Sequence, residues 1–71
     1  SSLDKFLNEL KELKANKEVS AKDITDAVTE LGYSKLTIYL YLQGKGKNVN
    51  TAHAILLFFR KKIQKRLKEI N

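Results

Sequence analysis

The stretch Leu31–Gly46, LGYSKLTIYLYLQGKG, decides how this chain folds. Gly32 follows an apolar residue and can take the left-handed backbone conformation that ends a helix. Two positions later, Ser34 supplies a side-chain oxygen that can cap the next helix. No glycine or proline interrupts residues 35–43. A helix that stops at a glycine and restarts within about three residues has the outline of a helix-turn-helix.

Three further helices are predicted from apolar residues at helical spacing and from capping residues. They cover about residues 3–15, 21–31 and 52–70. Asn50 or Thr51 is expected to cap the last of them, whose first half is apolar on all sides and whose second half is strongly basic. These helices would surround the central stretch and supply most of its packing.

Residues 34–43 are predicted to be the remaining helix. Residues 37–42 also have strand propensity, but the chain offers no second strand to pair with them, so the helix is favoured. The sequence therefore predicts an all-α, compact four-helix domain with a central helix-turn-helix and a long basic C-terminal helix. Its core is expected to contain Ile24, Val28, Leu31, Ile38, Tyr41, Ile55 and Phe59.

The composition limits what this chain can be. Seventy-one residues, 42% of them hydrophobic, allow one small domain over residues 1–71. Because the sequence has no methionine, we expect a processed chain or a fragment of a longer protein. The longest apolar run, residues 54–59, is far too short to span a bilayer, and the start lacks a signal-peptide pattern. We expect a cytoplasmic protein.

The sequence does not predict an enzyme. It has no cysteine, and the single histidine, His53, cannot form a metal site alone. No acidic pair lies among apolar residues, and no nucleophile accompanies the histidine. Gly44-Lys45-Gly46-Lys47 lacks the spacing of a phosphate-binding loop. We therefore expect no catalysis, no metal and no cofactor.

Charge is distributed unevenly along the chain. The net charge is +6, yet residues 1–43 carry six lysines against seven acidic residues. Residues 44–71 carry eight basic residues and one glutamate. This asymmetry suggests a polyanionic partner, either nucleic acid or an anionic membrane, although a solubilising surface is an alternative.

The segment Ala27–Lys45 resembles the helix-turn-helix of the lambda-repressor/Cro-like family. The matching positions are a residue that packs against the second helix of the motif, the turn glycine, a β-branched core residue, an aromatic residue and a terminal Gly-Lys pair: Val28, Gly32, Ile38, Tyr41, Gly44 and Lys45. The resemblance covers about residues 6–59. It implies a DNA-binding domain in which the second helix of the motif reads base edges.

DNA binding is therefore the predicted function, as a transcriptional regulator or a module that organises nucleic acid. Ser20 begins a capping-box spacing, and backbone donors at such a helix start can contact phosphate. The partner is expected to be double-stranded DNA. Its expected contacts are Ser20, Lys22, Ser34, Lys35, Thr37, Tyr39, Lys45, Lys47, Arg60 and Lys61.

The outward positions of the central helix leave a second interpretation open. Leucine cannot make the paired hydrogen bonds that distinguish bases, so Leu36 and Leu40 would contact only thymine methyl groups or another protein. The domain could then be a non-enzymatic interaction or oligomerisation module with a protein partner. Its expected interface is Leu36, Leu40, Ile63, Leu67 and Ile70.

The last helix carries an apolar stripe that predicts a homodimer. At 1.5 Å per residue it would be about 29 Å long, against about 20 Å for the first helix. The surplus could instead pack against the chain's own N-terminus. Docking of the last helix on an anionic membrane is the weakest alternative, because its first half is expected to be buried.

Overall fold

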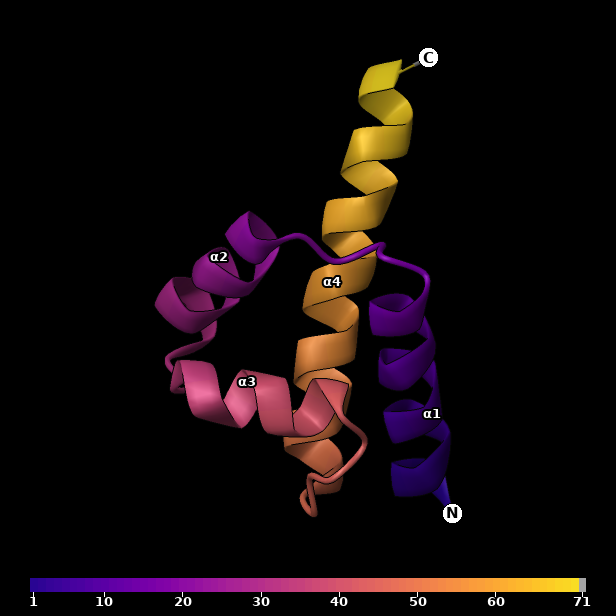
Figure 1. Ribbon diagram of the computed structural model, residues 1–71, viewed down its shortest axis with the longest axis vertical. Helices are drawn as coiled ribbons and strands as arrows, with labels where there is room; N and C mark the ends of the chain where they lie inside the picture. Colours follow the sequence, from indigo (N-terminus) through magenta and orange to yellow (C-terminus); the bar gives the residue numbers. More distant parts are fainter. Residues whose placement is uncertain (71) are drawn as a thin grey trace.

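The computed structural model describes residues 1–70 and the side chains of residues 1–69. These residues form four α-helices and no strand (Figure 1). The all-α, four-helix prediction is confirmed, as is the helical interpretation of residues 37–42. The helices are α1 (Ser2–Ala15), α2 (Ala21–Leu31), α3 (Lys35–Leu42) and α4 (Val49–Ile70).

The turn between α2 and α3 has the expected capping residues. Gly32 ends α2 in the left-handed conformation, with φ of 79°. Ser34 caps α3, because its hydroxyl oxygen accepts a hydrogen bond from the Thr37 backbone N–H at 3.1 Å. At the other end of α2, Ser20 and Asp23 form both hydrogen bonds of a capping box, each 3.0 Å long.

The start of α4 differs from its prediction. Asn48 is the cap, since its Oδ1 accepts a hydrogen bond from the Thr51 backbone N–H at 2.9 Å. The expected cap at Asn50 or Thr51 is therefore wrong, and α4 starts about one turn earlier than predicted. The reason lies in α3: the Tyr41 hydroxyl accepts a hydrogen bond from the Asn48 backbone N–H at 3.0 Å and so fixes this residue in place.

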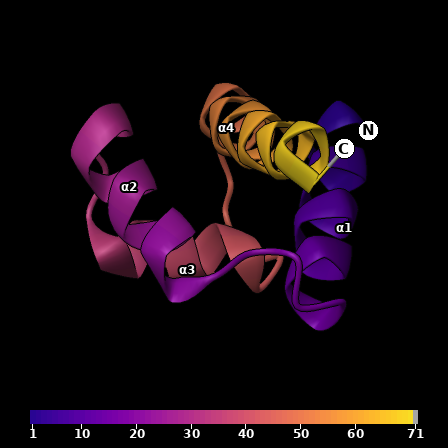
Figure 2. The ribbon, with the colours of Figure 1, turned by 90° about the horizontal axis from the view of Figure 1, so that it is seen from above.

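Helices α3 and α4 lie on opposite sides of the molecule. Seen from above, α4 lies along one side and α3 along the other, with α1 and α2 at the two flanks (Figure 2). The molecule measures 36 × 24 × 18 Å along its principal axes. At 1.5 Å per residue, the 22-residue α4 is about 33 Å long, so it runs nearly the full length.

The core lies where all four helices meet. Five of the seven predicted core residues are buried, whereas Val28 and Leu31 are only partly buried at the margin of α2. They lie at the margin because α2 turns Ile24 and Ala27 inward instead. The buried apolar residues are Leu7, Leu10, Ile24, Ala27, Ile38, Tyr41, Leu42, Ala52, Ile55, Leu56 and Phe59.

Candidate nucleic-acid interface

The outer face of α3 is apolar and open to solvent. Ile38, Tyr41 and Leu42 point into the core, so helical periodicity turns Leu36 and Leu40 outward. Leu36 is 80% exposed and Leu40 is 40% exposed, so these two leucines, four residues apart, form an adjacent apolar pair on the surface of α3.

Gln43, the C-cap residue of α3, is also exposed and extends this face by an amide. Sequence reasoning did not select it as a contact. Its position one turn beyond Leu40, on the same helical face, could have identified it as a contact residue.

The two hydroxyl residues at the start of α3 are engaged with each other. Besides capping the helix, Ser34 donates a side-chain hydrogen bond to the Thr37 hydroxyl oxygen at 3.0 Å. Both residues were predicted to approach nucleic acid. The structure places them at the N-terminal end of α3, with the Ser34 side chain exposed and Thr37 partly buried.

The ring of Tyr39 lies near two lysine side chains on one flank of α3. The Lys35 ammonium lies 6.0 Å from the centre of the tyrosine ring. The Lys14 ammonium, from α1, lies 5.9 Å from the same point. Both distances suit a cation–π interaction at an exposed site. The ring therefore brings a lysine of α1, which the sequence analysis did not select, onto the α3 surface.

Further lysines border α3 on its α1 side. One hollow of about 490 Å³ is lined by Lys11, Lys14 and Lys45, together with residues at the end of α3. A second, of about 220 Å³, is lined by Lys14 and Lys17 beside the Tyr39 ring. No carboxylate lines either hollow.

Sequence analysis missed this cluster because it compared the two halves of the chain and found the first half slightly acidic. The informative signal was spacing. Lys11 and Lys14 are three residues apart and so share one side of α1, and Lys17 in the loop after it lines the same hollow as Lys14. Glu9 and Glu12 lie on other sides of the same helix.

Three of the six basic residues of α4 form ion pairs with the other helices, namely Arg60, Lys62 and Arg66. Arg60 is hydrogen-bonded to Glu9 of α1. The Lys62 ammonium lies 2.7 Å from Asp26 of α2, and that carboxylate also accepts a hydrogen bond from Lys22 at 2.8 Å. Three of the eight positive charges in residues 44–71 are therefore balanced inside the molecule.

These contacts shift the pKa of both aspartates. Burial by itself would raise the pKa of Asp23, but hydrogen bonds from the Ser20 backbone and from Arg66, with the arginine charge, outweigh it and lower the pKa. Hydrogen bonds from Lys22 and Lys62 lower the pKa of Asp26 to about 2. The hydrogen bond to Asp26 in turn raises the pKa of Lys62.

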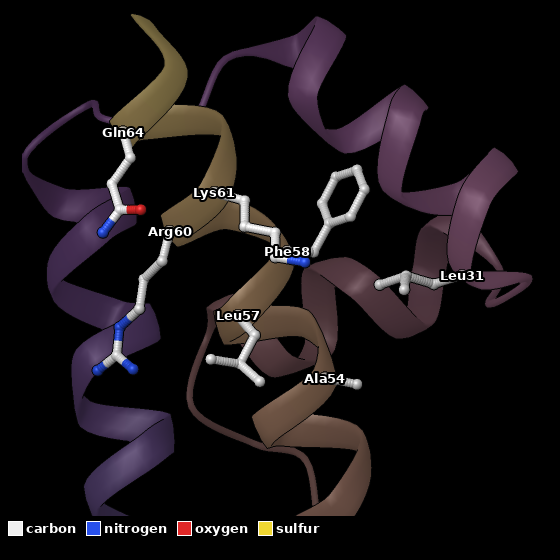
Figure 3. A pocket seen from close by; sticks show the side chains of 7 residues that line it. All are labelled: Leu31, Ala54, Leu57, Phe58, Arg60, Lys61 and Gln64. Carbon is white, nitrogen blue, oxygen red and sulfur yellow. The ribbon is translucent and has the colours of Figure 1, made fainter. Parts of the chain in front are cut away.

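The ten predicted contacts do not form one surface. Arg60 and Lys61 project from the outer side of α4, which faces away from α3 (Figures 2 and 3). Ser20 and Lys22 lie at the start of α2, where the first is used in the capping box and the second is paired with Asp26. The remaining six lie on α3, at its N-cap and in the loop after it: Ser34, Lys35, Thr37, Tyr39, Lys45 and Lys47.

No protein-family model, curated protein or solved structure matches this chain. The resemblance to the lambda-repressor/Cro-like family stays an expectation drawn from the residue pattern.

The outer side of α4 carries a groove of about 520 Å³ (Figure 3). Its apolar lining comes from Leu31 at the end of α2 and from Ala54, Leu57 and Phe58 on α4. Figure 3 shows the Lys61 side chain extending toward Phe58, with Arg60 and Gln64 on the opposite border.

The apolar stripe toward the end of α4 is only partly exposed. Ile63 is half-buried, because the helix still packs against its neighbours there, whereas Leu67 is 57% exposed. The prediction for Ile70 lies outside the described side chains.

In the part of the chain that the structure describes, no three His, Asp or Glu residues gather closely enough to hold a metal ion. The ring of His53 stacks on Phe6, with centroids 4.6 Å apart and planes at 7°. Within residues 1–70, no helix combines the length and apolar character needed to cross a bilayer.

Proposed function

We propose that this domain binds double-stranded DNA through α3 and the lysines around it, as a transcriptional regulator or a module that organises nucleic acid. The observation that carries the proposal is the convergence of Lys14 and Lys35 on Tyr39, beside an exposed helix whose adjoining hollows contain no carboxylate. No aspartate or glutamate occurs in the sequence between Glu30 and Glu69.

The shape of this region supports the proposal. An α-helix with its side chains is about 10–12 Å wide, which matches the major groove of B-form DNA. A second helix that follows the first after a short turn is the element that enters the groove in helix-turn-helix proteins. Here the connection is three residues long, and α3 lies on the surface with its outer face uncovered.

The lysines have separate roles in this proposal. Lysines bordering a groove-bound helix contact phosphates on either side, which fixes the orientation of the protein but carries no sequence information. We assign these contacts to Lys11, Lys14, Lys17 and Lys45, which line the two hollows, and to Lys47 in the loop after α3. Arg60 and Lys61 are not assigned, because they lie on the opposite side of the molecule.

The experiment that tests the proposal is a titration of a short duplex at several salt concentrations. Each phosphate neutralised contributes a slope of roughly −0.9 in log affinity against log salt. Replacing Lys14 and Lys45 together by glutamine should therefore flatten the slope by about two units. The matched control replaces Lys61 and Lys65, which removes the same charge from the outer side of α4 and should leave the slope unchanged.

Two results would count against DNA binding through α3. Equal losses in the two double variants would mean that net charge matters and the α3 surface does not. Absence of binding to any duplex at low salt, where the electrostatic contribution is largest, would reject the proposal altogether.

The groove on α4 favours a second candidate function, the docking of an acidic amphipathic helix from a partner protein. Its floor, formed by Leu57 and Phe58, suits an apolar helix face, and Lys61 and Lys65 beside it suit carboxylates. Glu30 is the one carboxylate that lines the adjoining hollow. A second copy of α4 in this groove would bring like charges together, which disfavours self-association here.

A synthetic helical peptide with leucines on one face and glutamates on the other tests this candidate. It should bind the domain, and Leu57→Ser should weaken binding whereas Leu36→Ser, on the other side of the molecule, should not. The same peptide with lysines in place of glutamates is the charge control. Equal binding of both peptides would exclude the proposed charge complementarity.

A further inference from the structure

The exposed face of α3 lacks the side chains that usually read bases by hydrogen bonding. Arginine or lysine makes the paired hydrogen bonds that identify guanine, and asparagine or glutamine makes those that identify adenine. Because Lys35 lies on the flank of α3 beside the Tyr39 ring, the outer face carries one such side chain, Gln43 at the C-cap. The centre of the face consists of Leu36 and Leu40, and Tyr39 at its edge is engaged with lysines.

A leucine held against the floor of the major groove distinguishes base pairs by what it meets. The polar edges of guanine, cytosine and adenine would lose water there without gaining a hydrogen bond, which is unfavourable. The one apolar group in the groove is the methyl at C5 of thymine, and 5-methylcytosine carries the same group in the same place. Contact between this methyl and a leucine removes apolar surface of both from water.

We propose that Leu36 and Leu40 recognise pyrimidines that carry a C5-methyl group, an inference that rests on the DNA-binding function proposed above. The leucines are four residues apart and so lie on one face of α3, about 6 Å apart along its axis. That spacing corresponds to about two base-pair steps of 3.4 Å. The domain therefore selects sites with methylated pyrimidine edges about two steps apart, while the surrounding lysines hold the phosphates.

The high exposure of Leu36 makes it a suitable residue to test. At 80% exposed it contributes little to the core, so Leu36→Ala should fold as the unchanged domain does, which circular dichroism can check. Leu57→Ala is the matched control, because this leucine is also exposed, at 42%, but lies in the groove on the other side of the molecule.

The experiment compares duplexes that differ only in methyl groups. A pool of random duplexes is enriched for binding to the domain and is then amplified in parallel with thymidine or deoxyuridine triphosphate. The thymine pool should bind more tightly, by about fourfold for each methyl group buried, which is the factor for removing one CH₂-sized apolar group from water. The uracil pool keeps every hydrogen-bonding edge and every phosphate.

A second arm separates thymine from 5-methylcytosine as the source of the methyl group. Amplification of the enriched pool with 5-methyldeoxycytidine triphosphate in place of deoxycytidine triphosphate adds methyl groups at new positions. Tighter binding would extend the recognition to 5-methylcytosine, whereas unchanged or weaker binding would assign it to thymine at the selected positions.

The leucine variants decide whether α3 is responsible. The ratio of thymine-pool to uracil-pool affinity should fall toward one in Leu36→Ala and should be unchanged in Leu57→Ala. Equal binding of the thymine and uracil pools by the unchanged domain would overturn the inference and leave the DNA-binding proposal standing. Failure to bind either pool at low salt would instead reject DNA binding itself.

Discussion

Arg66 holds Asp23 at the junction of α4 and α2, with its Nη1 donating to both carboxylate oxygens at 2.8 and 2.9 Å. Its second nitrogen, Nη2, donates to the Glu18 carbonyl in the loop before α2, at 2.6 Å. Asp23 is buried and also completes the capping box with Ser20. One carboxylate therefore secures the start of α2, and the arginine that binds it also fixes the preceding loop to the second half of α4.

Asp23 and Asp26 should make the domain less stable in acid. The pKa of both is lowered in the folded state, to about 2 for Asp26 from a usual value of 3.8. A group with a lowered folded pKa contributes stability that is present above its unfolded pKa and is lost as pH falls through the folded one. The free energy of unfolding, measured in urea, should therefore decrease between about pH 4 and pH 2.

Two variants separate this effect from general charge repulsion at low pH. Arg66→Gln removes a partner that lowers the pKa of Asp23, so it should reduce stability near neutral pH and make the loss in acid smaller. Glu12→Gln removes an exposed carboxylate outside the ion pairs of Asp23 and Asp26 and is the charge control. Identical profiles for Arg66→Gln and the unchanged domain would contradict the assigned role of the pair.

Ile38 and Leu36 test the orientation of α3. Ile38 is fully buried, so Ile38→Ala should lower the free energy of unfolding by about 2–5 kcal/mol. Leu36→Ala, two positions away, should change it by less than about 0.5 kcal/mol, because that side chain is mostly in solvent. A similar cost at both positions in chemical denaturation would show that α3 is rotated from the orientation described.

Leu67 tests the homodimer predicted from the length of the last helix. Phe59 is buried and Ile63 half-buried, so the apolar surface that a partner could cover is centred on Leu67. Sedimentation at increasing concentration should show self-association that Leu67→Asp abolishes and Leu36→Asp, on the other side of the molecule, does not. A monomer at high concentration, unaffected by Leu67→Asp, would exclude this dimer.

The sequence was informative where a structural signal is local. Gly32 and Ser34 predicted the turn between α2 and α3, since a left-handed glycine and a serine cap depend only on nearby backbone. The cap of α4 could not be chosen among neighbouring polar residues, because the choice of Asn48 depends on a hydrogen bond from its backbone to Tyr41, seven positions earlier.

The candidate site was harder to predict because it combines residues distant in the sequence. Lys14 reaches the α3 surface only through the packing of α1, and Arg60 lies away from that surface because it pairs with Glu9. Counting charges along the chain placed the positive surface at α4. The fold instead pairs several of those cations and gathers the lysines of α1 beside α3.

The close contact between Gly46 and Tyr41 gives a last prediction about the loop that carries Lys45 and Lys47. A Cβ built on Gly46 would overlap three atoms of the tyrosine ring, so no other residue fits without movement. Gly46→Ala should cost about 1–3 kcal/mol in the free energy of unfolding, as expected for overpacking. In the Tyr41→Leu background the same change should cost much less, because the ring atoms that it meets are gone.

Gly32→Ala is the control. A Cβ on Gly32 meets nothing within 4 Å, and the cost of this change comes from a φ of 79°. The costs of Gly32→Ala and Tyr41→Leu in the free energy of unfolding should therefore be additive. Additive costs for Gly46→Ala and Tyr41→Leu would show that the ring does not hold this loop.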